Sequence, residues 1–150
     1  MTYESIRQAK KSNAGIMLLV SELGGKYELG FIMLVANFML RKEDAFACAA
    51  TLCYSILINQ HLKLSFAEPR PFFIKPGPPG TPCDDLEYGN PSGHAIAFTS
   101  LMLIFYDGLR NLMDDLDCPM ILKSLVKLGT WSIIGVVTFS RFYFDVHSLD

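Results

Sequence analysis

Three short polar segments of the sequence border long apolar stretches, and their residue types suit chemistry on a phosphate ester. Lys63 and Arg70 lie seven residues apart in the first segment. Asn90–His94 forms the second segment, and Ser140–His147, which includes Arg141, forms the third. Lysine and arginine neutralise phosphoryl oxygens, and arginine adds a planar two-point contact. Because two histidines supply a nucleophile and a proton donor, the segments together favour phosphoryl transfer.

The second segment has the composition of a helix start. Asn90 is a typical N-cap residue, and Pro91 suits the first helical position. The backbone N–H groups of Ser92, Gly93 and His94 are then expected to point out of the helix towards an anion, which a glycine lets approach closely. The sequence therefore predicts an anion-binding helix N-terminus here.

Each of these residues also has a simpler interpretation when it is taken alone. His94 is consistent with a capping or surface histidine, and His147 with an exposed side chain near a terminus. Lys63 and Arg70 are consistent with long side chains that extend from an apolar helix to the lipid boundary. The ordered occurrence of all three segments is what favours a single site over these separate interpretations.

The elements that must position these segments are four apolar blocks. They span residues 29–40, 45–62, 95–109 and 121–139. Their length and the lack of two-residue alternation predict an all-α fold. Four such blocks without a polar face favour about four transmembrane helices over the core helices of a soluble all-α protein. A chain with 51% hydrophobic residues, 19% charged residues and a mean hydropathy of +0.29 agrees with an integral membrane helical bundle.

The order of the segments along the chain predicts where they meet. They lie at the end of the second block, at the start of the third and at the end of the fourth. In a chain that crosses a membrane back and forth, these three positions face the same side. The connections at the opposite side, residues 41–44 and 110–120, contain no histidine. The sequence thus predicts that the cations and histidines converge at one membrane face.

Composition excludes several other functions. The net charge of −2 and the pI of about 5.9 give no support to nucleic-acid binding. The four cysteines show neither a CxxC nor a CxxH pattern, so we expect free thiols and no structural zinc. Seven of the eight prolines lie between residues 69 and 91, which predicts one long irregular loop beside the site. Residues 1–28 are expected to form a separate N-terminal segment with an interfacial helix.

The three segments resemble the signature motifs of the phosphatidic acid phosphatase type 2 superfamily. Lys-x6-Arg-Pro stands at residues 63–71, Pro-Ser-Gly-His at 91–94 and Ser-Arg-x5-His at 140–147. That superfamily includes lipid phosphate phosphatases, glucose-6-phosphatase and vanadium haloperoxidases. The resemblance implies a domain over residues 29–150 that is similar to the membrane-bound branch. Because the family core includes at least one further helix, we expect this domain to be incomplete at its C-terminal end.

The resemblance also implies a role for each motif residue. His147 is expected to be the nucleophile that forms a phosphohistidine, His94 the general acid, and Asp150 the carboxylate that orients His147. The family places this aspartate four residues after the histidine; Asp150 follows by three, which still shares a helical face. The remaining implied residues bind phosphate: Lys63, Arg70, Ser92, Gly93 and Arg141. No metal and no other cofactor is implied.

The sequence therefore predicts a membrane phosphatase that hydrolyses a phosphate monoester or diphosphate of a lipid, in the endoplasmic reticulum or another endomembrane. Its expected partners are the lipid phosphate substrate and membrane lipids. One alternative is a non-catalytic membrane protein that keeps a degenerate phosphatase pocket for lipid binding or structure. Another is a soluble acid phosphatase or haloperoxidase, which would use the same chemistry outside a bilayer.

Overall fold

The computed structural model describes residue 16, residues 19–69 and residues 88–143. Four helices make up most of these residues: α2 (Lys26–Met39), α3 (Lys42–Phe66), α4 (Gly93–Asp115) and α5 (Met120–Tyr143). Residues 19–22 are also helical and lead into a turn before α2, and no strand occurs in the described ranges. The all-α prediction is confirmed, and each predicted apolar block corresponds to one helix.

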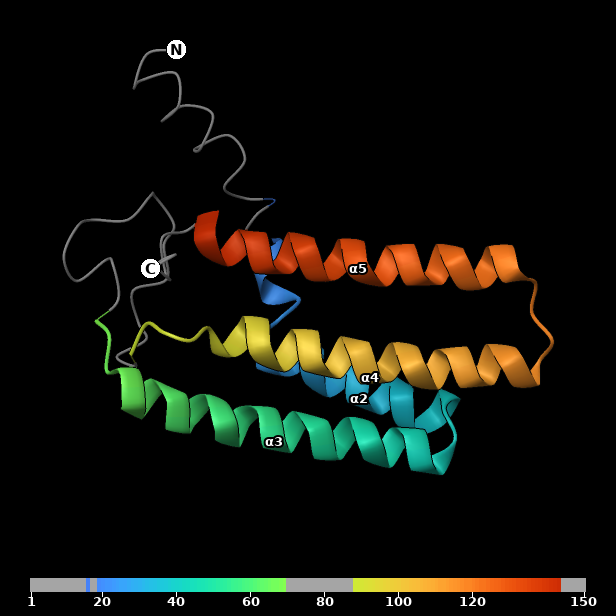
Figure 1. The fold of residues 1–150 in the computed structure, drawn as a ribbon, viewed down its shortest axis with the longest axis horizontal. Coiled ribbons are helices and arrows are strands. Elements are labelled where there is room, and N and C mark those ends of the chain that lie inside the picture. Colours follow the sequence, from blue (N-terminus) through green and yellow to red (C-terminus); the bar gives the residue numbers. More distant parts are fainter. Residues whose placement is uncertain (1–15, 17–18, 70–87, 144–150) are drawn as a thin grey trace, which may run out of the picture.

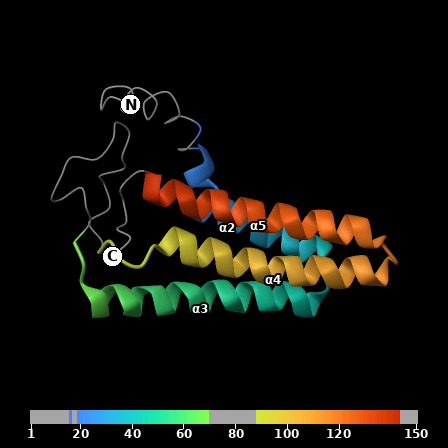
Figure 2. The same cartoon turned by 45° about the horizontal axis from the view of Figure 1, so that its top comes forward.

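The helices form an elongated bundle around α4. Figures 1 and 2 show α3, α4 and α5 running side by side, with α2 behind α4. Accordingly, α4 contacts all three other helices, and α2 also contacts α3. The end of α3, the start of α4 and the end of α5 lie together at one end of this bundle (Figure 1). This end, which holds the motif segments, is called the motif end below.

The helices extend beyond the apolar blocks that predicted them. The largest difference is in α4, which continues through charged residues to Asp115. In this last turn Arg110 Nε lies 4.0 Å from Asp114 Oδ2 on the same helix face, a spacing of four that supports a helix. A run of apolar residues predicts only the apolar part of a helix. A polar last turn, as in α4, therefore extends beyond the predicted range.

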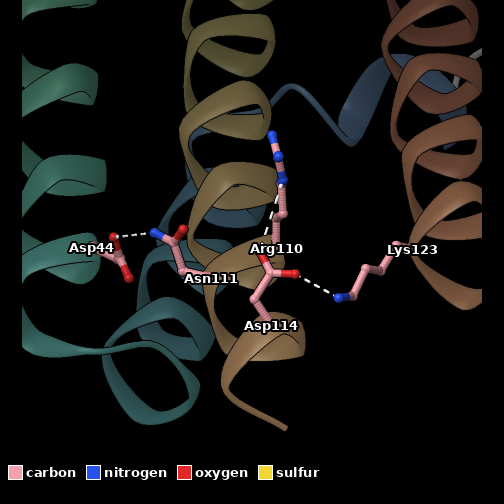
Figure 3. Close-up of polar contacts among 5 residues, drawn as sticks. All are labelled: Asp44, Arg110, Asn111, Asp114 and Lys123. Carbon is pink, nitrogen blue, oxygen red and sulfur yellow. Dashed lines mark hydrogen bonds and ion pairs between the residues drawn. The ribbon is translucent and has the colours of Figure 1, made fainter. Parts of the chain in front are cut away.

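Polar side chains join the helices at the opposite end of the bundle (Figure 3). Asn111 on α4 donates a hydrogen bond of 3.1 Å to Asp44 on α3. Lys123 on α5 donates from Nζ to Asp114 on α4, at 2.5 Å. The α3–α4 crossing is also close here, since a Cβ added to Gly108 would lie 3.1 Å from Asp44 Cβ on α3 and 2.7 Å from Cδ1 of Leu40, the C-cap of α2. This end is therefore held by both packing and polar contacts.

Burial in the bundle differs from that of a typical water-soluble protein, although its core is still largely apolar. Large apolar side chains lie exposed along the helices, among them Phe38 at 80%, Phe46 at 76% and Ile121 at 76%. Several buried side chains are instead polar: Ser21, Ser55, Asn59, Lys63, Thr130, Ser140 and Arg141. The rest of the interior is apolar and includes large side chains such as Leu29, Phe98 and Leu101. Polar groups that face inward and apolar groups that face outward are typical of a bundle surrounded by lipid.

Two of the helices are long and apolar enough to cross a membrane by length and composition. They are Lys42–Phe66, which is α3, and Met120–Arg141 of α5, and they contain 18-residue windows with mean hydropathies of 1.2 and 1.5. The first has 25 residues and the second 22, and a helix needs about 20 to span the hydrocarbon core. The 14 residues of α2 are fewer than that number, and α4 ends in a charged turn. The sequence and this structure together indicate a membrane protein.

Candidate functional site

The site is built where three helices meet at the motif end. Lys63 lies one turn before the end of α3, Gly93 and His94 begin α4, and Arg141 lies in the last turn of α5. The end of α3, the start of α4 and the end of α5 lie at the same end of the bundle (Figure 2). The convergence predicted from the order of the segments is thus present for these described residues.

Lys63 belongs to a polar stripe on α3 that is buried against the bundle. Ser55, Asn59 and Lys63 follow one another at intervals of four, so they share one helix face. Their exposed fractions are 7%, 4% and 5%. A lysine that extends to the lipid boundary would be exposed, so Lys63 instead places its ammonium group inside the protein. A buried cation is costly unless it meets anions or hydrogen-bond acceptors.

The end of α3 brings the next motif segment close. The helix ends at Ala67, which adopts a left-handed conformation with φ of 50° and donates its N–H to Lys63 O at 2.9 Å. Gly89 N donates to Glu68 O at 2.8 Å. This hydrogen bond joins the two ends of the proline-rich loop, so the start of α4 is fixed beside the end of α3.

The start of α4 differs from the prediction by two residues. Ser92, rather than Asn90, is the N-cap, and its Oγ accepts a hydrogen bond of 3.3 Å from Ala95 N. Pro91 therefore precedes the helix instead of occupying its first position. The physical reason is that serine caps as well as asparagine does, and its position three residues before Ala95 suits the capping geometry. Gly93 and His94 are consequently the first two residues of the helix, where the N-terminal dipole favours an anion.

Asn59 of α3 lies directly against Gly93. A Cβ added to Gly93 would lie 3.0 Å from Asn59 Nδ2, which is closer than almost all real contacts. The Oδ1 atom of Asn59 is buried, and no hydrogen bond reaches it from the described part of the chain. A side chain at position 93 would therefore require Asn59 to shift by a few tenths of an ångström, and its amide stands beside the first turn of α4.

Arg141 is buried, with 5% of its surface exposed. Its Nη1 donates a hydrogen bond of 2.5 Å to Ser21 Oγ, and Ser21 is itself only 4% exposed. Nearby, a Cβ added to Gly24 would lie 3.4 Å from both His94 Cβ and Val137 Cγ1. The turn that precedes α2 thus lies between the start of α4 and the end of α5.

These positions place two cationic side chains and a helix N-terminus at the same end of the bundle. Lys63 and Arg141 are nearly fully buried cations at the end of the bundle where the N-terminus of α4 also lies. Helix N-termini carry a partial positive charge, and low-dielectric surroundings strengthen its effect. A phosphoryl group is an anion that such an environment can bind.

Several predicted site residues lie outside the described residues: Arg70, His147 and Asp150. Three residues that the motif analysis did not identify lie at this end instead: Ser21, Gly24 and Asn59. Of these three residues, only Asn59 could have been identified from the sequence, because it lies four residues before Lys63 and therefore on the same helix face. Nothing in the sequence near Ser21 points to a residue 120 positions away.

Comparison with known protein families gives one match. Residues 44–150 match the family model of the PAP2 superfamily, and this match covers the three motif segments. No curated protein and no solved structure matches the chain. Membership of this family supports a phosphatase-type function. Because the matched residues make up more than half of the sequence, the chain belongs to the PAP2 superfamily.

Proposed function

We propose that the protein is an integral membrane phosphatase that hydrolyses a phosphate monoester or diphosphate of a lipid through a phosphohistidine. The observation that supports this most is the pair of buried cations, Lys63 and Arg141, at the same end of the bundle as the N-terminus of α4. Phosphoryl transfer depends mainly on positioning and on stabilising negative charge, which these groups can supply.

The proposed reaction has two steps. A ring nitrogen of His147 attacks phosphorus, the bond to the ester oxygen breaks, and His94 donates a proton to that oxygen as it leaves. Water then attacks the phosphohistidine and gives a proton back to His94, which breaks the P–N bond and releases inorganic phosphate. Asp150 is proposed to hold the ring of His147 in the reactive tautomer.

The remaining motif residues are proposed to bind the phosphoryl oxygens. Lys63, Arg70 and Arg141 neutralise their charge, while the start of α4 at Ser92 and Gly93 receives an oxygen through backbone N–H groups. The reaction uses histidine as both nucleophile and acid, so no metal is required. An endomembrane location remains part of this proposal.

An apolar groove beside the site favours a lipid substrate. It has a volume of about 510 Å³, and α2, α4 and α5 line it. Two of its lining residues connect it to the site: Leu23 precedes Gly24, and Phe98 lies four residues after His94 on the same face of α4. An alkyl chain in this groove would therefore leave its phosphate close to His94.

Phosphate release by the purified full chain in detergent tests the function. We expect the wild type to release phosphate from phosphatidic acid in the presence of EDTA, to be inhibited by vanadate and to form a 32P-labelled phosphohistidine. His147→Ala should abolish both labelling and turnover. His61→Ala is the matched control, because this exposed histidine of α3 lies outside the motifs. Lipid binding without labelling or turnover would favour the non-catalytic alternative.

The leaving group separates the roles of the two histidines. His94→Ala should slow hydrolysis of phosphatidic acid by roughly 100-fold or more, because an alkoxide needs a proton. The same variant should retain most activity on p-nitrophenyl phosphate, whose leaving group departs without one. An equal loss on both substrates would contradict the general-acid role.

The groove can be tested separately from the chemistry. Val35→Trp adds bulk to the α2 wall of the groove. We expect it to raise KM for a long-chain lipid phosphate without changing KM for p-nitrophenyl phosphate. An unchanged KM for the lipid would remove this support for a lipid substrate.

A further inference from the structure

We infer that the turn before α2 is part of the active site and that Ser21 is a positioning residue for Arg141. This inference rests on the proposed function, because it assigns Arg141 to the phosphoryl group. The turn lies outside residues 44–150, which match the family model. A role of this turn in the active site therefore does not follow from the family match and is argued from the contacts of the turn.

The first support is the contact between Ser21 and Arg141. The guanidinium donates through Nη1 to Ser21 Oγ, and both residues are more than nine-tenths buried. Arginine has a long side chain whose reach and direction must be fixed before it can hold a phosphoryl group in one orientation. A serine hydroxyl is uncharged, so this bond orients the guanidinium without cancelling its positive charge.

The second support is the packing of Gly24 on the start of α4. The position of a Cβ at residue 24 is 3.4 Å from His94 Cβ and 3.5 Å from His94 O. The same position is 3.4 Å from Val137 Cγ1, one turn before Arg141 on α5. The turn thus touches the backbone of the proposed acid and the helix that carries the phosphate-binding arginine.

The turn is internally linked, so these two contacts move together. Leu23 N donates to Val20 O and Gly24 N donates to Ser21 O, each at 3.2 Å. Figures 1 and 2 both place this segment beside the C-terminal end of α5. A displacement of Ser21 would therefore shift the surface against which His94 rests. The turn therefore supports both His94 on α4 and Arg141 on α5.

Vanadate binding and turnover by Ser21→Ala, Ser21→Thr and the control Ser132→Ala test this inference. Ser132 is an exposed hydroxyl residue of α5 outside the site. We expect Ser21→Ala to raise the vanadate dissociation constant and KM by about 10-fold, the lower range for a hydrogen bond to a charged group. Ser21→Thr keeps the hydroxyl and should restore most of the affinity. Ser132→Ala should behave as the wild type.

A double-mutant cycle tests whether Ser21 acts through Arg141. In an Arg141→Lys background, which removes the planar fork, Ser21→Ala should cause little further loss of vanadate affinity. Additive losses, or a failure of Ser21→Thr to restore affinity in a variant that unfolds at the wild-type temperature, would overturn the inference. A purely structural role would lower the unfolding temperature without this pattern.

The same measurements distinguish the inference from the proposed function. A wild type that binds vanadate but releases no phosphate would contradict the phosphatase proposal. The vanadate affinities of the Ser21 variants would still show whether Ser21 positions Arg141 for anion binding. A wild type that neither binds vanadate nor releases phosphate would contradict both.

Discussion

At the scale of single residues, Asn59 packs closely against Gly93 at the start of α4. The amide Nδ2 occupies the space where a side chain at position 93 would begin, at 3.0 Å. Because α4 starts at this residue, any displacement here moves the first N–H groups of the helix. The two residues are therefore expected to depend on each other energetically.

Gly93→Ala tests this dependence. We expect kcat/KM for phosphate release to fall roughly 10-fold, because the added methyl pushes the start of α4 away from Asn59. In an Asn59→Ala background the same substitution should cost much less, since the conflicting amide is gone. Gly129→Ala is the control, because an added Cβ there meets nothing within 4 Å. Equal losses in both backgrounds would exclude the packing explanation.

At the scale of elements, the crossing of α3 and α4 depends on Gly108 at the end opposite the site. A Cβ at this position would lie 2.7 Å from Leu40 Cδ1 and 3.1 Å from Asp44 Cβ. The Leu40 methyl can move, whereas the Asp44 Cβ is fixed to its helix. Small residues at helix crossings in membranes allow this kind of close approach.

Gly108→Val should therefore destabilise the bundle more than the same change at a lipid-facing glycine. Gly135→Val is the matched control, with nothing near an added Cβ and the same loss of helix propensity. We expect a difference of about 1–3 kcal/mol in the free energy of unfolding, the usual cost of overpacking. Equilibrium unfolding in mixed detergent measures it, and equal values for both variants would refute a tight crossing.

The link between α4 and α5 at this end is electrostatic. The hydrogen bond from Lys123 is the main cause that lowers the pKa of Asp114 below its ordinary 3.8, although desolvation acts in the opposite direction. A carboxyl group with a lowered pKa stabilises the fold above the unfolded value, and this contribution is lost as the pH falls through the folded value.

A comparison of the wild type with Lys123→Met over pH should show this dependence. The wild type should unfold at a higher temperature above pH 3.8, and the difference should vanish as the pH falls below that value. The effect should be small and weakened by salt, because the pair is exposed. Lys127→Met, one turn further along α5, is the control. A difference that persists at acidic pH would show that packing, rather than charge, is responsible.

At the scale of the whole molecule, the bundle has two ends with different chemistry. One end holds the motif residues, and the other holds the short connections that join α2 to α3 and α4 to α5 (Figure 1). Exposed apolar side chains lie along the helices between them. Such an arrangement suits a protein whose two ends face opposite sides of a membrane.

Cysteine labelling in sealed vesicles tests this orientation. Tyr88→Cys places a thiol at the motif end and Leu116→Cys places one at the far end, both at exposed positions and both in a cysteine-free background. We expect a membrane-impermeant maleimide to label one position from outside and the other only after permeabilisation. Labelling of both from the same side of an intact membrane would be incompatible with helices that span it.

The sequence was sufficient to predict the helices and the end at which the motifs meet. Long apolar runs predict helices because the side chains of each run must either be buried or face lipid. Because successive helices run in opposite directions, their order predicts which helix ends lie together. Lys63, Gly93, His94 and Arg141 were identified correctly as residues of one end. The helix boundaries were less exact, because capping by Ser92 and pairing by Arg110 depend on local geometry.

Only the tertiary structure places Ser21, Gly24 and Asn59 beside the motif residues. Each is a common residue type with no motif of its own, and Ser21 meets Arg141 across 120 residues of sequence. Sequence patterns report what a residue does within its own element, over spans of a few residues. Contacts between distant elements depend on how helices pack and how closely a glycine lets them approach, so they are decided when the bundle forms.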